Sequence, residues 1–134
     1  MNTKRYIWAS LAVFLFIFLA EFAFHAMIMQ ESYNLHMEIL RPQTDQEATF
    51  PVMLIGFLVL AFGFCLVFAK GYEGRGVAEG VRFGLYVAIA FGVSSHLINY
   101  SVFPYPGSWV LAWIVGESVI LMLAGVVAAL IYRR

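Results

Sequence analysis

Four ionisable residues stand inside long apolar stretches of this sequence: Glu21, His25, His96 and Glu117. Glu21 and His25 are four residues apart, so both side chains fall on one face of a helix. An ionisable side chain at membrane depth is costly, and such residues usually face the interior of a helical bundle, pair with one another and often mark function. The sequence therefore predicts a buried polar layer, and any chemistry is expected there.

Glu21 is the first candidate for a proton or cation site. A carboxylate buried in a membrane can take up and release a proton near neutral pH, as proton-coupled transporters require. His25 and His96 would then act as relay groups, and Glu117 as a second acid. Asn99, three residues after His96, would add a polar side chain on nearly the same face. The function expected from these residues is proton-coupled or cation transport.

Ser32 and His36 extend the polar pattern beyond the first apolar stretch. His36 follows His25 by eleven residues, which is about three helical turns, so a continuous helix would place it on the same face. These two side chains are expected to line a route from the external surface to Glu21.

A metal or haem is an alternative occupant of the same layer. The candidate metal ligands are His25, His96, Glu21 and Glu117, which could bind zinc or a di-metal centre. The two histidines could also ligate one haem iron. The first pair has the spacing Glu-x-x-x-His, whereas soluble di-iron bundles use Glu-x-x-His. No cofactor is expected, and metal or haem binding is kept as the second alternative.

A structural role is the other alternative. Hydrogen bonds between buried polar side chains hold membrane helices together at roughly 1 kcal/mol each. The layer could therefore stabilise an accessory subunit of a larger membrane complex. The sequence contains no HExxH, GxSxG or Ser–His–Asp order that would indicate a hydrolase. An enzyme is not the expected class.

The composition is that of an integral membrane protein. Of the 134 residues, 63% are hydrophobic and 12% are charged, and the mean hydropathy is +0.85. Soluble domains are about 45–50% apolar and about 25% charged. A net charge of zero does not indicate a nucleic-acid partner, and the single cysteine excludes an internal disulfide. The expected partner is the lipid bilayer of a plasma membrane or bacterial inner membrane.

Four segments reach the length of about 20 residues that crosses a bilayer. We predict one domain, an all-α four-helix membrane bundle with spans at residues 6–29, 51–69, 81–103 and 108–132. Pro51 would stand in the first turn of the second helix, with Thr49 as its cap. Residues 30–50 form a polar external connector that either projects as helix or lies on the membrane surface. The glycine-rich link 70–76 is expected to be a flexible turn.

Small residues predict where the helices touch. A stripe of them recurs at every fourth position of the third span: Gly80, Gly84, Ala88 and Gly92. This pattern forms close helix contacts in membranes. His96 continues the stripe, so it should point into the bundle. Gly56 and Gly63 are expected to allow a similar approach at the second span.

The positive charges predict the orientation. Only Arg41 stands on the connector side, and the other Lys and Arg residues all fall on the opposite side: Lys4, Arg5, Lys70, Arg75, Arg82, Arg133 and Arg134. Lysine and arginine are enriched on the cytoplasmic side of membrane proteins. Both termini are therefore predicted to be cytoplasmic and residues 30–50 external.

In its size, its four helices and the stretch Leu19-Ala20-Glu21, the chain resembles the small multidrug transporters. The resemblance implies a first-helix glutamate, Glu21 here, that exchanges a solute for protons. The long connector and the acid at Glu117 depart from that pattern. A solute path through four helices is narrow, so a homo-oligomer is also expected.

Overall fold

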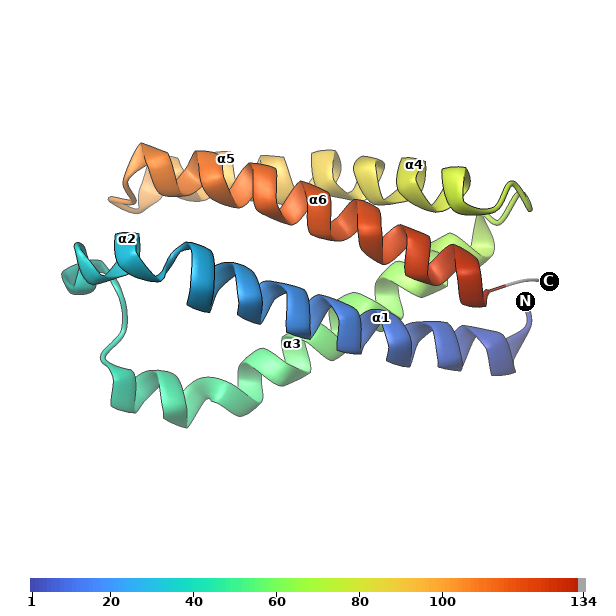
Figure 1. The fold of residues 1–134 in the computed structure, drawn as a ribbon, viewed down its shortest axis with the longest axis horizontal. Coiled ribbons are helices and arrows are strands. Elements are labelled where there is room, and N and C mark those ends of the chain that lie inside the picture. Colours follow the sequence, from blue (N-terminus) through green and yellow to red (C-terminus); the bar gives the residue numbers. More distant parts are fainter. Residues whose placement is uncertain (133–134) are drawn as a thin grey trace.

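The computed structural model describes residues 1–132, and this part of the chain is helical without any strand (Figure 1). Arg133 and Arg134, which enter the prediction of orientation, lie outside the described residues. The helical elements in chain order are α1 (Thr3–Ala23), η1 (Phe24–Ile28), α2 (Gln30–Asn34), η2 (Met37–Ile39), α3 (Gln43–Lys70), α4 (Val77–Val87), η3 (Ala88–Val93), α5 (Ser94–Val102) and α6 (Gly107–Ile131).

Within residues 1–132, four continuous helical stretches are long and apolar enough to cross a membrane, which confirms the predicted number. They are Thr3–Ile28, Gln43–Lys70, Val77–Val102 and Gly107–Ile131. The first of them joins α1 to η1, and the third joins α4, η3 and α5. In Figure 1 both chain ends lie at one end of the bundle, and α2 lies at the other. We call the second end the connector end, because residues 29–42 and 103–106 join the helices there.

The predicted start of the second span was wrong. Helix α3 begins at Gln43, so Pro51 lies inside it rather than in its first turn. Pro42 stands just before the helix, and its carbonyl accepts the backbone N–H of Asp45, which starts the first turn. Thr49 does not cap the helix, since its hydroxyl donates to the Asp45 carbonyl within it. The connector therefore ends at Pro42 rather than at Phe50.

The small residues of the third span pack α4 against α6, as predicted. A Cβ added at Gly80 would lie 2.1 Å from the carbonyl oxygen of Gly125, and one added at Gly84 would lie 2.2 Å from that of Leu121. Ala88 continues this face and is fully buried. The backbones of the two helices thus touch, which only glycine allows at these positions.

The prediction that Gly56 and Gly63 allow a close helix contact at α3 was wrong. A Cβ added at Gly56 or Gly63 would meet nothing within 4 Å. Helix α3 packs along α1 but separates from it toward the connector end (Figure 1). The glycines of α3 face open space because this helix crosses the bundle obliquely.

At the end that carries the chain termini, aromatic rings close the bundle between α3 and α4. The Phe83 ring lies 4.7 Å from that of Phe64 and 5.4 Å from that of Phe68, between centroids. Toward the connector end α3 diverges from the other helices (Figure 1), although its Phe57 ring still lies 6.0 Å from that of Phe18 on α1, between centroids. The bundle is therefore tightly packed at one end and looser at the other.

The link between α3 and α4 is a hydrogen-bonded loop rather than the free turn that was predicted. Glu79 is buried, and its carboxylate accepts the backbone N–H groups of Glu73 (2.6 Å) and Arg75 (2.7 Å). Gly74 and Gly76 adopt positive φ angles of 81° and 69°, which suit glycine. One buried carboxylate thus fixes the start of α4.

The substitution Gly84→Ala should destabilise the protein by about 1–3 kcal/mol, the usual cost of overpacking, because its methyl group would strike the α6 backbone. Gly63→Ala is the matched control, since its methyl group enters open space. Both changes bring the same gain in helix propensity, about 1 kcal/mol. Thermal unfolding in detergent should show a lower midpoint for Gly84→Ala alone, and equal midpoints would contradict the contact between α4 and α6.

Candidate functional site

A widened turn positions the first histidine. At the end of α1 the chain forms the π-helical turn η1, in which the N–H of Met29 bonds to the carbonyl of Phe24 at 3.0 Å. The Phe24 ring rests on Gly116 of α6, where an added Cβ would lie 2.5 Å from it. This contact between the ring and Gly116 sets the position of η1 along α6. A second π-helical turn, η3, precedes His96, and such turns are frequent at functional sites.

Glu21 and His25 form the pair that their spacing predicts. The Nε2 atom of His25 lies 3.2 Å from Oε2 of Glu21. The side chain of Glu21 is 13% exposed and that of His25 is 39% exposed. The acid is thus inside the bundle, and the imidazole lies at its edge.

His96 and Glu117 form a second pair, between α5 and α6. The two side chains approach to 2.8 Å between Nε2 and Oε2. The His96 Nε2 atom is inaccessible to solvent and makes no aligned hydrogen bond, although it lies against the Glu117 carboxylate. Gly92 lies one turn before His96, and a Cβ there would come within 3.9 Å of the same carboxylate. The small-residue stripe therefore continues to His96, which points into the bundle toward this acid.

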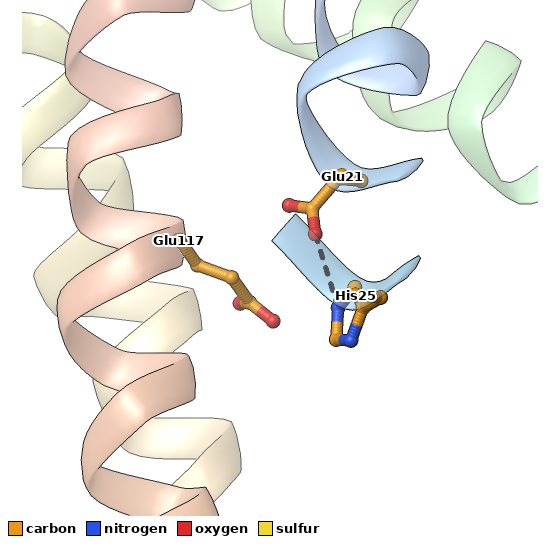
Figure 2. A group of neighbouring side chains, drawn as sticks. All are labelled: Glu21, His25 and Glu117. Atoms are coloured by element: carbon orange, nitrogen blue, oxygen red, sulfur yellow. Dashed lines mark ion pairs between the residues drawn. The ribbon is translucent and has the colours of Figure 1, made fainter. Parts of the chain in front are cut away.

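The two pairs meet in one cluster. One ligand atom from each of Glu21, His25 and Glu117 can be chosen so that all three lie within 4.8 Å of one another. Figure 2 shows Glu117 reaching from α6 toward the Glu21–His25 pair on the first helix. No Lys or Arg among residues 1–132 forms an ion pair with either glutamate. Imidazoles are the basic groups that contact these carboxylates.

Tyr33 is a member of the site that the sequence prediction missed. Its hydroxyl lies 2.5 Å from Nδ1 of His25 and accepts the indole N–H of Trp113 at 2.8 Å. Because Trp113 is a donor only, the hydroxyl hydrogen is free to bond to Nδ1. A neutral His25 then carries its hydrogen on Nε2, which faces Glu21. Tyr33 and Trp113 together set the orientation of this imidazole.

Tyr33 belongs to α2, beyond the first stretch that is long and apolar enough to cross a membrane. Burial raises the pKa of its hydroxyl above the ordinary value of 10.0. The hydrogen bond from Trp113 opposes this rise in pKa, while the negative charges of Glu117 and Glu21 add to it. The phenol is therefore held in its neutral form.

A signal for this aromatic contact was present in the sequence. Trp109, Trp113 and Glu117 follow one another at intervals of four, so they share one face of α6. The indole N–H of a buried tryptophan also needs an acceptor. Trp109 is fully buried and donates to Ser32 at 2.7 Å. The two tryptophans therefore bind the connector to α6 over the cluster.

The predicted route through Ser32 and His36 takes a different form. The helix that contains Ser32 ends at Asn34, so His36 does not continue the face of Glu21 and His25. The His36 ring instead lies against Trp109, with 5.8 Å between centroids. The Ser32 hydroxyl oxygen likewise accepts the indole N–H of Trp109. Both residues therefore contact Trp109, and the continuous stripe that was predicted does not form.

Asn99 is not brought into the cluster. It is exposed on α5, and its side chain makes no hydrogen bond or ion pair with the described residues. His96 and Asn99 both lie in α5, and the three-residue step between them turns Asn99 toward the exposed face of that helix.

Two hollows meet at Glu21. The first, with a volume of about 330 Å³, lies between α1 and α3 and also borders His25 and Tyr33. The second, of about 200 Å³, is bordered by Glu117 and by residues of α3, α4, η3 and α5. The Glu21 carboxylate can therefore be approached from two sides.

The neutral phenol gives a prediction that depends on pH. The folded protein holds the Tyr33 proton more tightly than the unfolded chain does, so stability should be unaffected below pH 10 and fall as pH rises above it. The difference in phenolate absorbance between wild type and Tyr33→Phe should report one phenol that titrates above pH 10. A difference curve centred at or below 10 would contradict the burial of this hydroxyl.

Comparison with known proteins adds no assignment: no family model, no curated protein and no solved structure matches the chain.

Proposed function

We propose that this protein binds a cation at the Glu21–Glu117 cluster and moves it across a membrane in exchange for protons. The observation that supports this most is the approach of two carboxylates inside an apolar bundle, with imidazoles as their basic neighbours. Two carboxylates about 5 Å apart repel by roughly 3 kcal/mol even at an effective dielectric constant of about 20. A bound cation or protons remove this repulsion.

Exchange follows from the shared site. A proton on either carboxylate weakens its hold on a cation, and a bound cation displaces the proton, so the two compete. The hollow between α1 and α3 borders Glu21 and His25 and gives access from the connector end. The second hollow borders Glu21 and Glu117 on the other side of the cluster. For a cation to pass beyond the cluster, the contacts of the Phe83 ring with Phe64 and Phe68 have to open.

Helix α3 is suited to that movement. A Cβ added at Gly56 or Gly63 would meet nothing within 4 Å, and the helix separates from α1 toward the connector end (Figure 1). The pair α4 and α6 is locked by contact between backbones. A hinge-like shift of α3 against the other helices would therefore cost the fewest contacts.

Under this proposal the connector end faces outward and both termini face the cytoplasm, in a plasma membrane or bacterial inner membrane. The support is the excess of Lys and Arg at the other end of the bundle. An oligomer, with the open face of α3 toward a second copy, is compatible with this arrangement.

Orientation can be tested by cysteine labelling of intact cells in a Cys65→Ala background. Gln43→Cys should react with a membrane-impermeant maleimide, because Gln43 is exposed at the connector end. Arg75→Cys, exposed in the opposite link, should react only after the cells are opened. The reverse pattern would place the cluster in the inner half of the membrane and overturn the proposed orientation.

Transport depends on the charge of Glu21. In proteoliposomes that contain a pH-sensitive dye, a gradient of a transported cation should drive proton movement with wild-type protein. Glu21→Gln should reduce this flux to the level of empty liposomes, while its melting temperature stays close to that of wild type. Glu31→Gln is the matched control, since Glu31 is exposed on α2 and outside the cluster.

The structural alternative predicts the opposite result. If the cluster only holds helices together, wild-type protein should show no flux above empty liposomes for any cation tried. Glu21→Gln and His96→Gln should then lower the melting temperature. That outcome would leave an accessory subunit of a larger complex as the better description.

A further inference from the structure

We infer that the cation bound at this cluster is a divalent transition-metal ion of the zinc class, held by Glu21, His25 and Glu117. The inference rests on the proposed function and names the class of cation. His96, against Glu117, is a positioning residue, and the fourth place at the metal is left to water.

The distances fit such an ion. Ligands at about 2.0–2.2 Å from a tetrahedral zinc ion stand about 3.3 Å from one another. The His25 Nε2 atom and Glu21 Oε2 are already 3.2 Å apart. The three candidate ligand atoms lie within 4.8 Å, so Glu117 has to close the remaining gap. The Glu117 side chain has three rotatable bonds through which its carboxylate can approach the other two ligands.

The ligand types select among metals. Calcium and magnesium prefer sites made of oxygen ligands alone, and copper(I) prefers thiolate and thioether sulfur. One imidazole nitrogen with two carboxylate oxygens suits zinc and its divalent neighbours. The single thiol, Cys65, contacts Ser10, about 16 Å along α1 from Glu21, and is not available to the site.

Charge supports a divalent ion. Two ionised carboxylates carry a charge of −2, and no Lys or Arg within residues 1–132 forms an ion pair with them. A divalent ion with neutral imidazoles makes the site electrically neutral, as an apolar surrounding requires. A monovalent ion would leave one negative charge uncompensated.

The surroundings of His25 are those of a metal ligand. Histidines that bind metal through one ring nitrogen are usually held by a hydrogen-bond partner on the other. Here the Tyr33 hydroxyl lies 2.5 Å from Nδ1 and is itself held by Trp113. When Nε2 binds the metal, the ring hydrogen moves to Nδ1 and bonds to the Tyr33 oxygen. The hollow between α1 and α3 gives the ion a way to reach Nε2.

The test is equilibrium binding to the full chain in detergent, after removal of metal with a chelator. Isothermal titration with Zn²⁺ should give one site per chain, and Co²⁺ should give the visible absorption of a tetrahedral complex. Glu21→Gln and Glu117→Gln should weaken Zn²⁺ binding by more than about 100-fold. Tyr33→Phe, which removes only the outer partner, should weaken it by about 10-fold. Glu31→Gln should bind as wild type does.

Folding is checked separately by circular dichroism and by melting curves. Zn²⁺ should raise the melting temperature of wild type and Glu31→Gln, but not that of folded Glu21→Gln. Binding of less than one ion per five chains, equal binding by Glu21→Gln, or equal affinity for Mg²⁺ would overturn the metal site. Cation-driven flux in liposomes without Zn²⁺ binding would overturn this inference alone. Zn²⁺ binding without any flux would support the metal site and overturn transport.

Discussion

Two acids of like charge must share a small space inside an apolar bundle, and the local architecture follows from that constraint. Glu21 and Glu117 each contact an imidazole, at 3.2 Å and 2.8 Å. Water is scarce in such surroundings, so each charge needs a fixed partner. The histidines supply partners that are neutral or positive, which leaves the cluster able to accept a cation. A lysine or arginine in the same place would neutralise one acid permanently.

Close packing brings these acids together. Contact between the backbones of α4 and α6 aligns η3 and His96 beside Glu117. Packing of the Phe24 ring on Gly116 places η1 at the same level along α6. His25 lies within a π-helical turn, and His96 lies just after another. Such a turn adds a residue to the helix and rotates the side chains that follow. The cluster thus depends on glycines that carry no chemistry themselves.

The sequence was sufficient to predict the features that depend on helical spacing. These include the number of helices, the Glu21–His25 pair and the Gly80–Gly84 face. It was insufficient where neighbouring segments decide the outcome. Helix α3 starts at Gln43 because Pro42 begins its first turn, although the polar residues that follow read as a connector. The π-helical turns η1 and η3 interrupt the regular spacing, and Asn99 lies on the exposed face of α5 although it follows His96 by only three residues. The aromatic partners of His25 come from a fold-back that spacing does not encode.

The helices are packed unevenly, and α3 is the one that could move to release an ion. An ion site between rigid helices would bind without release, because leaving would require contacts to break on every side. Here η1 packs on α6 through Phe24, and the backbones of α4 and α6 touch. Helix α3 borders both hollows, and a Cβ added at its Gly56 or Gly63 would meet open space. Helix α3 therefore both borders the site and packs least closely against the other helices. Under the proposed function, an ion would be bound between the first helix and α6 and released by displacement of α3, which carries none of the proposed ligands.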